Sequence, residues 1–397
     1  MKIGKKRLVA AVAAVAAISL ALAGCSSDGE GSSDGPTGEP IKVGMAYAFT
    51  STISQMAEQA KNAVQLAVDT ANEEGGIGGR PIELVLYDTE YKPELAQQLL
   101  RRAFTADRVT ALLGPAGTGE GLAVSDLIES SEVPSIQFAG LDPRLTEGKE
   151  WTFRVAPVTP DVADGVLRVA KALDAKDIVL IRDDSGFTEG AVPFIYDKAE
   201  GLGVNIETEI KYTGGATDFT AQVGAMIDAA PDAVIISGQG GSDHGNLARA
   251  MVDQGLMVPL IGFSGISYPD AIEVAGEAYN QLPGVYTVQA VEVSKPEYKA
   301  FVEAYSENWD VDGVIPEIPT QAYDAMKLLI EALKVTEGEG GEALADALRE
   351  LPDHTGAVGR QGSHQKFIDG NALQGVYLSP YRMVDGVPTL DEQINYN

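Results

Sequence analysis

The sequence predicts an α/β protein with two lobes, each built on a doubly wound parallel sheet with helices on both faces. Near-continuous apolar segments, typical of buried parallel strands, alternate with amphipathic helical patterns along the chain. This alternation starts again after residues 153–157, which indicates two series of elements. The chain of 397 residues is also longer than one hydrophobic core usually serves, so two domains are expected.

The elements follow in order from the apolar patterns. The first series has strands at 41–49, 82–88, 109–115 and 133–140, with helices at about 56–71 and from Pro93, where a proline costs no helical hydrogen bond. The second series has strands at 177–184, 204–212, 232–239 and 259–265, and helices from 161, at 187–202, from 219 and at 244–255. The last third has helices at 294–308, 319–335 and 341–351, with strand-like pieces at 284–290, 356–359, 364–367 and 375–384.

Residues 1–24 have the layout of a secretory signal peptide. Basic residues at positions 2–7 precede an apolar run from residue 8 to 23, which ends in small side chains. The run is shorter than the roughly 20 apolar residues that a transmembrane helix needs. We therefore expect this segment to direct secretion rather than to span a membrane.

Cys25 is the only cysteine in the sequence, and with residues 22–24 it forms a tetrad that resembles the bacterial lipobox. The resemblance implies that Cys25 becomes an acylated N-terminus that tethers the protein to the membrane, since two acyl chains suffice for stable anchoring. The alternative is an ordinary signal peptide followed by an incidental cysteine, which can form no internal disulfide. Residues 25–40 are rich in Ser, Gly, Asp and Glu and predict a flexible acidic linker, with the folded part beginning near Ile41.

The net charge of −29 argues against a nucleic-acid partner, because affinity for phosphates depends on Lys and Arg. In open α/β sheets, ligands bind beyond the carboxyl ends of the strands. Glycine-containing turns follow five predicted strands, at 114–121, 137–143, 183–190, 238–245 and 262–265, which suggests one ligand held between the lobes. In the first turn, Gly117, Thr118 and Gly119 are a candidate cradle for an anion or carboxylate, and a tight turn without a ligand is the alternative.

Signatures of enzymes and metal sites are missing from the sequence. There is no Gly-x-x-x-x-Gly-Lys-Ser/Thr loop for nucleoside triphosphates, and residue 243 is Asp where a dinucleotide fingerprint needs its third glycine. Residues 262–266 lack the last glycine of a nucleophile elbow. The three histidines do not have the spacing of a zinc site. We therefore expect no catalytic residues, no metal and no cofactor.

The order and spacing of many segments resemble the leucine/isoleucine/valine-binding family, which has the type I periplasmic-binding-protein fold and delivers solutes to ABC importers. The resemblance covers the chain from about Ile41 to its end and rests on segments such as 41–50, 72–96, 112–119, 153–157, 183–190, 232–238 and 321–333. It implies two lobes joined by three hinge crossings and closing around the solute. The expected lobes are residues 41–157 with 289–352, and residues 158–288 with 353–397.

The resemblance also implies a ligand pocket. Thr118 matches the hydroxyl residue that binds the ligand carboxylate in the family, with Gly117 and Gly119 beside it. Further positions carried over are Met56, Ala139, Gly140, Leu141, Phe187, Gly240, Gly241 and Ser264. Leu141 lacks the hydroxyl usual in the family, Phe187 replaces a common tyrosine, and Met56 stands where a tyrosine is usual.

Ser264 stands where the family's glutamate pairs with the ligand ammonium. A buried ammonium without a carboxylate costs several kcal/mol. Another acid, Asp243 or Glu317, could supply the charge, or the ligand has no α-ammonium. An amino acid remains the family default, and an amine-free aromatic or aliphatic acid is the competing hypothesis.

The resulting functional prediction is a monomeric solute-binding lipoprotein of an ABC importer. It would lie on the extracytoplasmic face of the cell membrane, anchored at Cys25, with the permease and ATPase subunits as partners and a small amino-acid-like or carboxylate-bearing solute as ligand. A ligand sensor of the same fold is a second hypothesis, and an extracytoplasmic enzyme is a third.

Overall fold

The computed structural model describes residues 36–51, 53–310, 314–375 and 377–394. The predicted signal peptide, the predicted lipidation site at Cys25 and residues 26–35 of the predicted linker lie outside the described residues. Contacts with the folded part begin before Ile41, because the Gly38 N–H donates to the Gly79 carbonyl at 2.9 Å and the Arg80 Nε–H donates to the Glu39 carbonyl at 2.9 Å. The end of the predicted linker therefore packs on the turn that follows the first helix.

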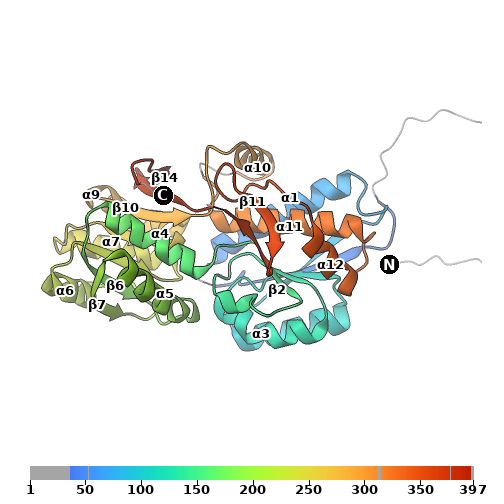
Figure 1. The fold of residues 1–397 in the computed structure, drawn as a ribbon, viewed down its shortest axis with the longest axis horizontal. Helices are drawn as coiled ribbons and strands as arrows, with labels where there is room; N and C mark the ends of the chain where they lie inside the picture. Colours follow the sequence, from blue (N-terminus) through green and yellow to red (C-terminus); the bar gives the residue numbers. More distant parts are fainter. Residues whose placement is uncertain (1–35, 52, 311–313, 376, 395–397) are drawn as a thin grey trace, which may run out of the picture. The chain divides into compact units, whose positions relative to one another are not determined.

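The described residues form two seven-stranded sheets (Figure 1). The first sheet has the order β11-β12-β5-β4-β3-β1-β2, and β1 to β5 and β12 pair in parallel while β11 pairs antiparallel with β12. Its strands are β1 (Ile41–Tyr47), β2 (Ile82–Asp88), β3 (Ala111–Leu113), β4 (Ser135–Gln137), β5 (Thr152–Arg154), β11 (His364–Ile368) and β12 (Asn371–Gln374).

The second sheet has the order β14-β13-β10-β9-β8-β6-β7, with parallel pairing from β7 to β10 and antiparallel pairing at β13 and β14. Its strands are β6 (Asp177–Arg182), β7 (Asn205–Lys211), β8 (Ala233–Ser237), β9 (Leu260–Gly262), β10 (Val285–Gln289), β13 (Ser379–Val384) and β14 (Val387–Leu390). The predicted fold class of two lobes with mainly parallel sheets is confirmed.

Helices cover both faces of each sheet. Those of the first lobe are α1 (Ser54–Glu73), α2 (Pro93–Arg102), α3 (Thr118–Ser131), α10 (Pro296–Ser306), α11 (Glu317–Val335) and α12 (Gly341–Glu350), with short turns at Ala103–Asp107 and Pro143–Leu145. Those of the second lobe are α4 (Thr159–Ala172), α5 (Gly186–Leu202), α6 (Thr220–Ala229), α7 (Gly241–Asp253), α8 (Pro269–Ala275) and α9 (Ala278–Gln281), with a 3₁₀ turn at Ser264–Ser267.

The strands supply side chains to a core on each face of their sheet. In β3, Ala111 and Leu113 pack in the core that contains α1, α11 and α12, whereas Leu112 packs on the other face with α2 and α3. In β6, Leu180 packs with α4 and α5, and Ile181 packs with α6 and α7. Successive side chains of a strand point to opposite faces, so a strand buried on both faces must be apolar throughout.

The chain crosses between the sheets three times, after β5, after β10 and after β12. The sequence predicts that the lobes divide at residues 157, 288 and 352. The boundaries at 157 and 288 remain predictions. The third boundary is wrong, because β11 and β12 belong to the first sheet rather than the second. Asn371 of β12 pairs with Arg154 of β5, and the Arg154 Nε–H donates to the Asn371 side-chain oxygen at 2.8 Å. This long-range pairing, rather than any local pattern, assigns the segment to the first lobe.

Candidate functional site

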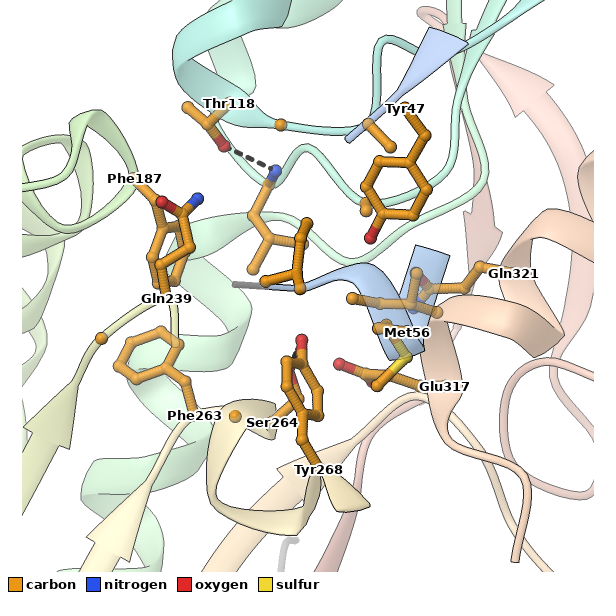
Figure 2. A pocket seen from close by; sticks show the side chains of 18 of the residues that line it. Tyr47, Met56, Thr118, Phe187, Gln239, Phe263, Ser264, Tyr268, Glu317 and Gln321 are labelled. Carbon is orange, nitrogen blue, oxygen red and sulfur yellow. Dashed lines mark hydrogen bonds between the residues drawn. The ribbon is translucent and has the colours of Figure 1, made fainter. Parts of the chain in front are cut away.

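A cavity opens at the carboxyl ends of the parallel strands of both sheets (Figure 2). The volume open to the centres of water-sized spheres is about 60 Å³, more than the roughly 10–15 Å³ that one water molecule needs. The residues that line it are Tyr47, Ile53, Met56, Tyr91, Ala116, Gly117, Thr118, Ala139, Leu141, Phe187, Gly238, Gln239, Phe263, Ser264, Gly265, Tyr268, Glu317, Ile318 and Gln321.

The turn after β3 brings Thr118 into the cavity. This turn requires glycine at position 114, because its φ is +90° and a Cβ there would lie 2.3 Å from the Ala46 carbonyl oxygen. Thr118 is the first residue of α3 and is only 3% exposed. Its Oγ1 accepts a hydrogen bond from the Leu141 N–H at 3.2 Å, shown as the dashed line in Figure 2. The hydroxyl proton of Thr118 is thus available for donation to an acceptor in the cavity.

Tyr91 reaches the cavity from the turn after β2, which sequence reasoning missed. Its backbone has φ of +60°, a left-handed conformation that costs a residue with a side chain roughly 1–2 kcal/mol. The Tyr91 hydroxyl lies against Gly117, where an added Cβ would be 2.7 Å from its oxygen. Because Gly117 has no side chain, it leaves space for the Tyr91 hydroxyl.

The second lobe contributes aromatic side chains. Phe187 begins the first turn of α5 after β6, and Phe263 follows β9. Their ring centroids are 5.6 Å apart with the planes at 84°, an edge-to-face arrangement. Ser264 follows Phe263, and its hydroxyl lies 3.4 Å from the Tyr268 hydroxyl. Gln239, which was not predicted, lines the cavity from the turn after β8.

Four predicted residues do not line the cavity. Gly119 lies where α3 approaches α5, because a Cβ on Gly186 would be 3.4 Å from the Gly119 Cα. A Cβ on Gly140 would point at the Leu145 side chain, 2.5 Å away. Gly240 faces the Asp243 side chain, and a Cβ on Gly241 would meet the Asp270 carboxylate at 2.2 Å. These glycines allow close packing within or between the lobes and are not wall residues of the cavity.

Of the two acids considered as substitutes for the missing glutamate, Glu317 lies in the cavity and Asp243 does not. Asp243 is buried within the second lobe, where its Oδ2 accepts from the Gly215 N–H at 3.0 Å. Glu317 is the first residue of α11 and is 5% exposed. One of its carboxylate oxygens accepts from the Ala290 N–H at 2.7 Å. Burial raises the pKa of Glu317 to about 7, against the lowering effects of the Ala290 N–H and the Ser264 hydroxyl.

Gln321 is a second polar residue that the sequence did not single out. It follows Glu317 by one helical turn, so both side chains lie on the same face of α11. Gln321 is 1% exposed, yet neither its amide oxygen nor its amide nitrogen has a hydrogen-bond partner among the described residues. Buried amides are normally paired, so this side chain is suited to accept from and donate to a molecule in the cavity.

The charge of the lining is one-sided. Among the described residues that line the cavity, Glu317 has the only carboxyl group, and none is Lys, Arg or His. A purely anionic solute would therefore meet hydroxyls and backbone amides but no cation, together with an acid that ionises near neutral pH.

No helix in the described part of the chain is both long enough and apolar enough to cross a membrane. Within the same residues, no three His, Cys, Asp or Glu side chains are grouped as metal ligands would be.

Comparisons with known proteins show what the chain is similar to. It is 24% identical over 376 residues to the Leu/Ile/Val-binding protein homolog 7 of Brucella abortus (strain 2308), with 88% of this chain and 91% of that protein covered. A leucine binding protein from Thermotoga maritima MSB8 has a similar structure, with a TM-score of 0.79, 23% identity and coverage of 88% and 97%. A solute binding protein of an ABC transporter from R. palustris, in complex with 4-hydroxybenzoate, matches with a TM-score of 0.78, 20% identity and coverage of 89% and 96%.

A family model described as periplasmic binding protein matches residues 40–382, which include both sheets up to β13 and every residue that lines the cavity. The predicted family resemblance is confirmed by this match. The chain therefore belongs to the periplasmic binding protein family, a family of solute-binding proteins.

Proposed function

We propose that this protein binds a small amino-acid-like solute in the cavity between its lobes and delivers it to the membrane subunits of an ABC importer. The observation that carries the proposal is that turns at the carboxyl ends of both sheets line one common cavity. The family and the similarity to Leu/Ile/Val-binding proteins support it. A solute that touches both lobes favours the closed arrangement of the lobes.

The protein acts in this proposal as a carrier and not as an enzyme. The support is the family, whose members bind solutes, and the similarity to Leu/Ile/Val-binding proteins. The solute is expected to leave the site chemically unchanged, and the partners are the permease and the ATPase of the importer. A monomer is sufficient, since one chain supplies the whole lining.

We further propose that the protein is anchored by lipid at Cys25 on the extracytoplasmic face of the cell membrane. The support is the basic and apolar leader, the lipobox-like residues 22–25 and the acidic linker that follows. Cys25→Ala is expected to move the protein from the detergent phase to the aqueous phase or to leave an uncleaved precursor. Unchanged partitioning of the variant would remove this part of the proposal.

Native mass spectrometry of protein purified without denaturant tests solute binding directly. The expected result is a non-covalent adduct that denaturation releases and that binds again, unchanged, to the stripped protein. X-ray scattering should then show a smaller radius of gyration with the solute than without it. Recovery of a chemically converted solute would instead favour an enzyme, and a protein that holds no small molecule and closes on none would contradict the proposal.

A further inference from the structure

We propose that Glu317 and Gln321 of α11, a helix of the first lobe, bind a protonated amine of the solute and so select amine-bearing solutes. This inference rests on the proposed function, since it takes for granted that a small solute occupies the cavity. It goes beyond that function by naming the residues that bind the charged group of the solute and the lobe to which these residues belong.

The first step is that α11 is part of the first lobe. Its apolar face, including Met326, Leu329 and Leu333, is buried in the same core as α1 and strands β1, β3 and β4. Figure 1 shows α11 lying beside α1. Both side chains therefore start from the first lobe, while the Glu317 carboxylate also accepts from the N–H of Ala290, which packs in the core of the second lobe.

The second step is the chemistry of the α11 pair. One carboxylate oxygen of Glu317 accepts from the Ala290 N–H. Among the described residues the Gln321 amide oxygen has no hydrogen-bond partner, and the Ser264 and Tyr268 hydroxyls lie beside Glu317 (Figure 2). An ammonium group has three N–H donors and needs a carboxylate when it is buried. This cluster offers several acceptors around one acid, and no lining residue supplies a competing cation.

The third step is the position of the two polar groups. Figure 2 shows Thr118 and the Glu317–Gln321 pair at different sides of the cavity. A solute with an acceptor at one end and an amine near the other can therefore contact both while it lies against the first lobe. The second lobe then adds neutral groups, namely the Phe187 and Phe263 rings, the Gln239 amide and the hydroxyls of Ser264 and Tyr268.

The fourth step is that a substitution away from the solute-binding groups can prevent the two lobes from closing. Gly190 of α5 packs against the first lobe, where a Cβ would lie 2.8 Å from the Asp142 carboxylate. Asp142 is held there by Arg144, whose backbone N–H and Nε–H both donate to its Oδ1 at 2.9 Å. A tryptophan at position 190 has no room in this arrangement, so Gly190→Trp should hold the lobes apart.

The experiment measures discrimination rather than affinity alone. Isothermal titration calorimetry is run with L-leucine and 4-methylpentanoic acid, and with L-phenylalanine and 3-phenylpropanoic acid, each pair differing by the amine. We expect the wild-type protein to prefer one of the amino acids to its amine-free partner by roughly 10- to 100-fold, the range for a hydrogen bond to a charged group. Glu317→Gln should bring this ratio close to one, while Gln321→Leu should lower it partially.

Gly190→Trp should weaken both members of the pair together and leave their ratio unchanged. Glu331→Gln, on the same helix but paired with Lys334 outside the cavity, is the matched control and should change neither value. Thermal melts of each variant verify folding, which Glu317→Gln should retain because a glutamine oxygen can still accept from the Ala290 N–H.

The inference is overturned if Glu317→Gln keeps the wild-type ratio, or if Gly190→Trp loses it, which would place the selection in the second lobe. It is also overturned, with solute binding intact, if the amine-free acids bind more tightly than the amino acids or if the solute found by mass spectrometry has no amine. A protein that holds no solute and binds none of the four probes would instead contradict the proposed function itself.

Discussion

The two walls of the cavity differ in charge. The first-lobe wall carries the Glu317 carboxyl together with the Thr118 hydroxyl and the Gln321 amide. The second-lobe wall carries neutral groups, among them the edge-to-face pair Phe187 and Phe263. Hydrogen bonds and charge fix orientation and specificity, whereas apolar contact adds affinity with little direction. This difference suggests that one lobe selects the solute and the other retains it.

The largest expected effect is that the affinity for an amine-bearing solute depends on pH. This dependence comes from Glu317, which belongs to the first-lobe wall. The raised pKa of Glu317, about 7, means that the carboxyl is mostly protonated at pH 5 and mostly ionised at pH 8. Because an ammonium needs the ionised form, affinity for an amino acid should fall about tenfold per pH unit below 7 and level off above it, roughly 100-fold between pH 8 and 5.

Calorimetry across this pH range, in two buffers of different ionisation enthalpy, should also show release of a proton on binding near pH 6. The phenols of Tyr268 and Tyr381 interact with Glu317, but burial raises the pKa of both, so they stay neutral throughout. Glu317→Gln should abolish the pH dependence. An amino-acid affinity that is flat from pH 5 to 8 in the wild-type protein would show that Glu317 does not pair with the amine.

Thr118→Val is the next test of the first wall, and it keeps the shape of the side chain while removing its donor. The variant should bind either an amino acid or an amine-free acid about 2 kcal/mol more weakly, because both lose a hydrogen bond to a charged carboxylate. The Leu141 N–H also loses its acceptor, so a small part of the effect is structural.

Thr70→Val on α1, whose hydroxyl donates to the Leu66 carbonyl away from the cavity, serves as the control for Thr118→Val. An affinity that Thr118→Val leaves unchanged would mean that the solute's acceptor end lies at another turn.

A third prediction concerns Glu120, which lies behind the first wall in α3. Glu120 is 0% exposed, and no hydrogen bond of good geometry reaches its carboxyl oxygens from the described residues. Burial raises its pKa to about 7, and the nearby Thr89 hydroxyl lowers it in part. An acid whose pKa is raised by folding stabilises the folded state less as pH rises from its unfolded pKa toward 7. Urea unfolding should therefore show that the wild-type free energy of unfolding falls between pH 5 and pH 8. In Glu120→Gln it should fall less over the same range, by about 1–2 kcal/mol.

The same loss of stability with pH in Glu120→Gln and the wild-type protein would contradict the buried position of this carboxyl. Solute discrimination is expected to stay unchanged in this variant, because Glu120 does not line the cavity.

The parallel strands could be predicted because burial on both faces makes each of them a continuous apolar segment. Strands β11 and β12 were assigned to the wrong lobe because they are short and partly polar, and only their pairing with β5 decides their place. The pairing of a strand depends on partners that are distant in the sequence. The apolar pattern is read from neighbouring residues and does not reveal these partners.

Thr118, Phe187 and Ser264 lie on turns at strand ends, where the sequence placed them, and all three line the cavity; their role in binding stays a prediction. Tyr91 was missed because its presentation depends on a left-handed backbone in a turn without glycine. Gln321 was missed because its burial is not visible in a helical pattern read from the sequence alone. Gly240 and Gly241 do not line the cavity, and a Cβ on either would lie close to the Asp243 or Asp270 side chain, because glycine also permits close packing.

The smallest expected effect concerns the second wall and completes the comparison. Phe187→Leu keeps an apolar side chain but removes the edge-to-face contact with Phe263, which is worth roughly 0.5–1.5 kcal/mol. The affinities for an amino acid and for its amine-free partner should fall by the same amount, so their ratio and the pH dependence remain those of the wild-type protein. Stopped-flow kinetics should place the loss mainly in faster dissociation, since the second lobe retains a solute that the first has already selected. A change in the amine discrimination of Phe187→Leu would show that both walls take part in selection and that the proposed division between them is wrong.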